Sequence, residues 1–152
     1  MSTEPQARVF KYTRPEMRTK KTFVKLARTD RMMAYVQVLS SGGENNLHSH
    51  GHLDGFWMVL KGRARFYGEG DRLLADLGPH EGILVPRNFK YWFESASPEP
   101  LELLQIEAAD IPMPDDRQIL EDRKDHSDQR VRIGSPDIAF IDGRVHADPE
   151  AS

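Results

Sequence analysis

The chain has 152 residues, which is enough for one domain with a packed core and too few for two such domains. It contains no cysteine, so disulfides and thiolate metal ligands are excluded, and any metal would need nitrogen and oxygen ligands. The net charge of −3, the absence of a signal pattern and the absence of a long apolar run lead us to expect a cytoplasmic protein that binds neither nucleic acid nor membrane.

Short apolar or alternating runs recur along the chain with turn residues between them. Their β-branched and aromatic content, and their spacing of roughly 8–12 residues, indicate an all-β sandwich or barrel. The predicted strands are Thr22–Ala27, Met33–Leu39, Gly55–Leu60, Ala64–Tyr67, Arg72–Leu77, Gly82–Val85, Tyr91–Glu94 and Leu101–Ala108.

The two ends of the chain differ from this central region. We predict an N-terminal arm over 1–21, a barrel domain over 22–109 and a charged C-terminal extension over 110–152. Within the extension, Pro114 followed by two acids fits either a short helix through Lys124 or a solvated tail. The stretch 131–145 is too apolar for a solvated tail, so we expect it to dock on the core or on a partner subunit.

Two histidines separated by one residue, His48 and His50, are the strongest chemical signal in the chain. Residues two apart on a strand point to the same face, so both imidazoles would enter one cavity. Two convergent imidazoles indicate either a metal site or an acid–base site.

The stretch from Gly42 to Gly62 resembles the first motif of the cupin superfamily, with Gly42, His48, His50 and Gly62 in register. The stretch from Gly82 to Phe93 resembles the second motif. The resemblance implies a small single-domain, RmlC-like cupin, which is a double-stranded β-helix, or jelly-roll, barrel.

The chain departs from the cupin pattern at two ligand positions. Counting back from Gly62, the position of the family's glutamate ligand holds Gly55, which has no side chain. The position of the last histidine ligand holds Tyr91. Half of the ligand set that the resemblance implies is therefore missing.

One interpretation restores a metal site for a divalent ion such as Fe, Zn, Mn or Ni. With a bulge at Gly55, Asp54 would turn inward and form a two-histidine, one-carboxylate site with His48 and His50. His52 has the parity of a third nitrogen ligand if the strand continues that far, and Tyr91 is a further ligand once its phenol ionises. Such a site suits an oxygenase or a lyase.

The other interpretation needs no metal. His48 or His50 would remove a proton from carbon next to a carbonyl, while Tyr91 donates to the developing oxyanion. This chemistry suits an isomerase, epimerase, dehydratase or cyclase, and His48, His50 and Tyr91 are then the catalytic set.

Two aromatic residues and one apolar strand complete the predictions. Trp57 shares a face with Gly55, and Phe93 shares a face with Tyr91, so both either line the pocket or pack as ordinary core. The run Phe56–Leu60 is apolar on both faces, which favours a homodimer.

The sequence leaves two functions open: a cupin-type enzyme acting on a polar or carbonyl-bearing metabolite, or a non-catalytic module that binds or senses a small molecule.

Overall fold

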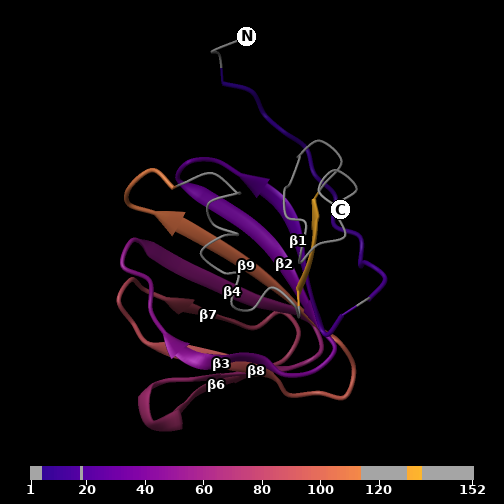
Figure 1. Ribbon diagram of the computed structural model, residues 1–152, viewed down its shortest axis with the longest axis vertical. Helices are drawn as coiled ribbons and strands as arrows, with labels where there is room; N and C mark the ends of the chain where they lie inside the picture. The colour runs from indigo at the N-terminus through magenta and orange to yellow at the C-terminus, as the bar shows by residue number, and fades with distance from the viewer. Residues whose placement is uncertain (1–4, 18, 114–129, 135–152) are drawn as a thin grey trace.

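The computed structural model describes residues 5–17, 19–113 and 130–134, and nearly all of its regular structure is β (Figure 1). One 3₁₀ turn, η1 (Glu69–Asp71), is the exception within these ranges. The strands are β1 (Lys21–Arg28), β2 (Met32–Leu39), β3 (Gly43–His48), β4 (Leu53–Lys61), β5 (Ala64–Tyr67), β6 (Leu73–Leu77), β7 (Gly82–Val85), β8 (Tyr91–Ser95), β9 (Leu101–Ala109) and β10 (Arg130–Gly134).

Two sheets face each other in this fold (Figure 1). The larger sheet has the order β10-β1-β2-β9-β4-β7, and the smaller has the order β3-β8-β5-β6. All pairings are antiparallel except that of β10 with β1. The all-β prediction is confirmed, and every predicted strand is present with ends that differ by two residues at most.

The structure adds two strands to the eight predicted ranges, one of which carries His48, already assigned to a strand by the parity argument. Gly43–His48 forms β3, whose polar composition hid it. Arg130–Gly134 forms β10, which pairs in parallel with β1 along Lys21–Lys25. The segment after Pro114, which fits either a short helix or a solvated tail, lies outside the described residues, as does 135–152. The proposed domain bounds stay a prediction.

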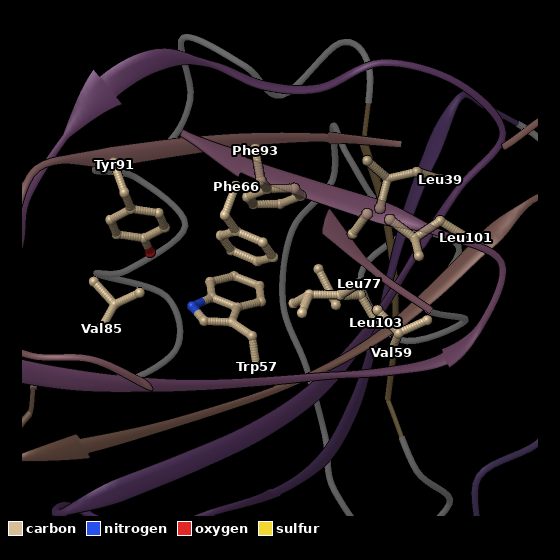
Figure 2. Packing of buried hydrophobic residues seen from close by; sticks show 11 residues of the cluster. Leu39, Trp57, Val59, Phe66, Leu77, Val85, Tyr91, Phe93, Leu101 and Leu103 are labelled. Atoms are coloured by element: carbon tan, nitrogen blue, oxygen red, sulfur yellow. The ribbon is translucent and has the colours of Figure 1, made fainter. Parts of the chain in front are cut away.

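The space between the sheets is filled in two layers (Figure 2). One side holds aliphatic residues that alternate inward along their strands, as expected for a two-layer β fold. Next to them lie the aromatic rings of Trp57, Phe66 and Phe93, with centroid separations of 5.1–5.7 Å. The aliphatic members are Leu39, Val59, Leu77, Leu101 and Leu103.

The first and last glycines of the first cupin-like motif occupy turns that require glycine. Gly42 and Gly62 have φ of +73° and +89°, a region that side-chain-bearing residues rarely adopt. A Cβ on Gly62 would also lie 3.0 Å from the Cα of Leu101. These turns deliver β3 and β5 to their sheet, so the motif glycines have a geometric role.

The outer face of the larger sheet is apolar and is partly covered by the N-terminal arm. Tyr12 and Met17 pack on a cluster that includes Val24, Val36 and Val38. The covering is incomplete, because Phe56 and Leu84, cross-strand partners on β4 and β7, are 43% and 67% exposed. No helix of the described ranges has the length and apolarity needed to cross a membrane.

A polar contact fixes the arm to this face. The Tyr12 hydroxyl donates a hydrogen bond of 2.5 Å to Oε1 of Glu102, and Arg14 Nε lies 3.5 Å from Oε2 of the same carboxylate. Burial, followed by the hydrogen bond and the negative charge of Glu102, raises the pKa of Tyr12 well above its usual value. The phenol therefore stays protonated in the folded chain at a pH where it ionises in the unfolded chain.

The raised pKa of Tyr12 predicts an alkaline loss of stability. Above pH of about 10 the unfolded state releases the phenolic proton and the folded state retains it, so the free energy of unfolding falls as pH rises. Tyr12→Phe should lower the free energy of unfolding at pH 7 by about 1 kcal/mol and flatten its decline above pH of about 10. Urea denaturation at several pH values measures both effects. An unchanged slope in the variant would contradict the raised pKa of Tyr12.

Candidate functional site

The pairing of β3 with β8 brings the predicted catalytic residues together. His48, the last residue of β3, is the cross-strand partner of Tyr91, the first residue of β8. The ring centroids of His48 and Tyr91 are 4.6 Å apart. His50 follows in the loop after β3, with its ring 5.2 Å from that of His48 and 6.5 Å from that of Tyr91. The three rings form one group.

A backbone contact fixes the tautomer of His48. Its Nδ1 lies 2.8 Å from the carbonyl oxygen of Asn46, and a carbonyl only accepts, so Nδ1 carries the proton. In the neutral imidazole the lone pair then lies on Nε2. His48 is therefore prepared to accept a proton at Nε2.

A buried carboxylate stands across from the position that lacks the motif glutamate. Gly55 on β4 is the cross-strand partner of Glu107 on β9. Glu107 is 1% exposed, and its Oε2 lies 3.8 Å from Nε2 of His50. The neighbouring strand thus supplies a carboxylate next to the histidine pair. A carboxyl group at this distance orients an imidazole.

Sequence reasoning missed Glu107, although strand parity holds a signal for it. Glu107 shares its parity on β9 with the buried Leu101 and Leu103, so a polar residue at that position faces inward. The signal is ambiguous from sequence, because Leu104 and Ile106 make the opposite face equally apolar.

Further polar groups lie on the inner face of the larger sheet. Gln37 on β2 and Gln105 on β9 are buried, and Gln37 Nε2 donates a hydrogen bond of 2.7 Å to Gln105 Oε1. Lys25 on β1 is 1% exposed and lies across from Tyr35, which itself lies across from Gln105. Buried polar groups of this number are unusual in a purely structural core.

The two aromatic residues predicted for the pocket lie at different depths (Figure 2). Trp57 is 2% exposed, and its ring contacts that of Tyr91 edge to face at 6.2 Å. Phe93 is fully buried, and its ring lies beside Trp57 and Phe66, toward the aliphatic layer. Trp57 thus borders the histidine and tyrosine group, whereas Phe93 packs behind it.

The structure does not bring Asp54 and His52 to this group. The pairing of β4 with β9 is regular through Gly55, so the predicted bulge is absent and Asp54 falls on the face opposite Gly55. Asp54 Oδ1 instead accepts a hydrogen bond of 2.9 Å from the backbone N–H of Arg87. His52 lies beyond the end of β3, and its Nδ1 lies 3.1 Å from Oδ1 of Asp110.

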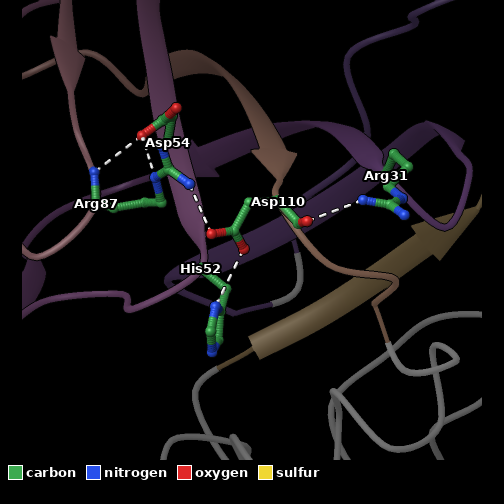
Figure 3. A network of polar contacts seen from close by, with 5 residues as sticks. All are labelled: Arg31, His52, Asp54, Arg87 and Asp110. Atoms are coloured by element: carbon green, nitrogen blue, oxygen red, sulfur yellow. Dashed lines mark hydrogen bonds and ion pairs between the residues drawn. The ribbon is translucent and has the colours of Figure 1, made fainter.

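Asp54 and His52 belong to a polar network at the ends of β4, β7 and β9 (Figure 3). Arg87 bridges Asp54 and Asp110, with Nη1 2.6 Å from Oδ2 of Asp110. Burial opposes ionisation of Asp110, yet the hydrogen bonds from Arg87 and His52 outweigh it and hold the pKa of Asp110 below its usual range. The network fixes the segment that follows His50, so its role at the site is support.

The described residues contain no group of three histidine, aspartate or glutamate side chains that could hold one metal ion together. The metal ligand set suggested by sequence, His48, His50, Asp54 and His52, is divided between the site and the polar network. The residues as placed do not fit a metal, and we derive no step through one.

Comparison with known proteins gives a likeness of structure. Neither a family model nor a curated protein matches the sequence. An RmlC-like cupin family protein with a double-stranded β-helix fold from Methanocaldococcus jannaschii is 19% identical, with 70% of this chain and 94% of that chain covered and a TM-score of 0.56. The cupin domain of Schizosaccharomyces pombe Cnp3 is 19% identical, with 77% and 75% covered and a TM-score of 0.58.

A conserved protein with a double-stranded β-helix domain from Klebsiella pneumoniae is 20% identical, with 68% of this chain and 91% of that chain covered and a TM-score of 0.57. Identities of this size show a shared fold only, so any function has to be argued from the residues of this chain. The two-sheet topology, the two motifs and these likenesses agree: the protein has the double-stranded β-helix fold of the cupin superfamily.

Proposed function

We propose that the protein is an enzyme that moves a proton on carbon next to a carbonyl group of a small metabolite. The observation that carries the proposal is the buried carboxylate of Glu107 beside His50, across from Gly55. Together with His48 and Tyr91 it makes a compact set of acid–base groups on one side of a hydrophobic floor.

The chemistry divides between these groups. Nε2 of His48 takes the proton from carbon, and the electron pair of the broken C–H bond moves onto the carbonyl oxygen. The Tyr91 hydroxyl donates to the oxyanion that develops there. Protonated His50, held beside Glu107, returns a proton to carbon. His48 then releases its proton to solvent and His50 takes one up, which restores both groups. An epimerase needs no more than this, an isomerase also moves a proton between two neighbouring oxygens, and a dehydratase or cyclase adds departure or attack of a neighbouring group.

Hydrogen–deuterium exchange tests this proposal without a known substrate. The protein is incubated in D₂O with a panel of sugars and 2-oxo acids, and NMR follows loss of the C–H signal next to each carbonyl. We expect catalysed exchange on at least one compound. Tyr91→Phe and Glu107→Gln should each slow it roughly 100-fold, which is typical for loss of a general acid or its support.

Matched variants control for indirect effects. Tyr67→Phe removes a hydroxyl that bonds Glu94 on the outer face of the smaller sheet, and Glu102→Gln alters a buried carboxylate on the outer face of β9. Both should leave the exchange rate unchanged. Saturable binding of a compound that is lost in Tyr91→Phe, without exchange on any compound, would refute the enzyme and favour the binding module.

The acid–base proposal also predicts indifference to chelators. Dialysis against a chelator should leave the exchange rate and the melting temperature unchanged, because no step uses a metal. Elemental analysis of untagged protein is the check. One iron, zinc, manganese or nickel per chain, lost in the His48→Ala, His50→Ala double variant, would overturn this prediction and establish a metal site with different ligands.

We also propose that the exposed part of the outer face pairs with a second copy of the chain. The support is the cross-strand pair Phe56 and Leu84, which continues the apolar cluster under the N-terminal arm. A self-complementary apolar patch is the usual basis of a two-fold dimer.

Sedimentation equilibrium should show a dimer that Leu84→Asp dissociates. Leu73→Asp, which changes an equally apolar residue, 52% exposed on the smaller sheet, should not. A monomeric wild-type protein would contradict the proposal.

A further inference from the structure

The indole nitrogen of Trp57 is a buried donor with no acceptor. Trp57 is 2% exposed, and among the residues that the structure describes nothing accepts a hydrogen bond from its Nε1. Leaving a buried N–H without an acceptor is costly, so native proteins rarely tolerate it without a reason. The other rings of this layer, Phe66 and Phe93, carry no polar atom. A phenylalanine would fill the same layer without that cost.

Gly55, which has no side chain, lies directly beside this donor. A Cβ built on Gly55 would lie 3.2 Å from Nε1 of Trp57, and the next nearest atom, the carbonyl oxygen of Val85, would be 3.7 Å away. Gly55 has ordinary β geometry in a regular strand pairing, so no turn demands glycine here. Any larger residue would crowd the indole N–H.

The donor faces the same side as the catalytic hydroxyl. Figure 2 shows the phenol oxygen of Tyr91 and the indole nitrogen of Trp57 both directed toward the side on which Val85 lies. The two rings meet edge to face at 6.2 Å. A pair of neutral donors aimed at one region is the arrangement that stabilises a developing oxyanion.

We propose that Gly55 and Trp57 form a binding subsite for the carbonyl oxygen of the substrate, in which the indole N–H is the second oxyanion donor beside the Tyr91 hydroxyl. This inference rests on the proposed function, because the oxygen bound there is the one that gains negative charge when the neighbouring C–H bond breaks. The ligand class is a small carbonyl compound, and carboxylates mimic its charged form.

NMR of the indole N–H groups tests the subsite directly. The chain has only two tryptophans, so protein labelled with ¹⁵N-tryptophan gives two indole signals. Trp92 is an internal reference, because its Nε1 already donates to Asp71 Oδ1 at 3.0 Å. Trp92→Phe, on the outer face, assigns the signals without touching the core. The probes are pyruvate, acetate and oxalate, with tetramethylammonium as a cation that has no acceptor.

We expect the Trp57 proton signal to move downfield and saturate with at least one of the three acceptor probes, while the Trp92 signal stays. Trp57→Phe should weaken binding of that probe about tenfold, as expected for the loss of one hydrogen bond. Gly55→Ala should abolish the shift, whereas Gly51→Ala should preserve it, because a Cβ there meets nothing nearer than 3.9 Å.

The outcomes separate this inference from the proposed function. A Trp57 signal that no acceptor probe moves, or a shift that persists in Gly55→Ala, would overturn the subsite even if Tyr91-dependent exchange is found. A saturating shift of Trp57 without any catalysed exchange would uphold the subsite as a ligand-binding feature and refute the enzyme.

Discussion

The antiparallel pairing of β4 with β9 is the contact on which the site depends. Its register places a residue without a side chain, Gly55, directly across from a buried carboxylate, Glu107. Because side chains alternate between faces, a shift of one residue would carry Glu107 to the outer face and bring an apolar residue inward. The pairing runs without interruption from Leu53 to Val59, so the register is held by many backbone hydrogen bonds. The polar network of Arg87 and Asp110 secures its end.

The side chains that stabilise the fold and those of the candidate site occupy different layers of the interior. The aliphatic layer is buried and its side chains have no polar atom to satisfy, so it supplies the hydrophobic stabilisation that the fold needs. The aromatic layer then separates it from the histidines and Glu107. Burying a charged group costs free energy unless other groups compensate. The stabilisation gained by burying the aliphatic layer offsets that cost in the fold as a whole, and the aromatic layer limits the access of water, which strengthens each electrostatic contact.

The sequence was sufficient for the fold and for the residues that a motif names. Alternating runs predicted the strands of the core, and the motif correctly grouped His48, His50 and Tyr91, although His50 lies in the loop after β3 and not on the strand that the parity argument assumed. What it could not predict depends on register between strands. Glu107 lies on a strand that is apolar on both faces, so its direction follows only from its partner Gly55. The bulge expected at Gly55 was wrong for the same reason, because backbone pairing across β9 keeps β4 regular.

The two departures from the cupin pattern are coupled once the structure is considered. A glutamate at position 55 would place its carboxylate beside the indole of Trp57 and opposite Glu107, and two buried carboxylates so close would repel each other. Glycine removes that repulsion and leaves the indole N–H uncrowded, while Glu107 keeps one carboxyl group beside His50. Tyr91 in place of a histidine then adds a neutral donor. Under the proposed function, a carboxylate-supported imidazole on one side and neutral donors on the other stand where the cupin pattern has metal ligands. A substrate with a proton to lose and an adjacent oxygen to receive charge fits that division.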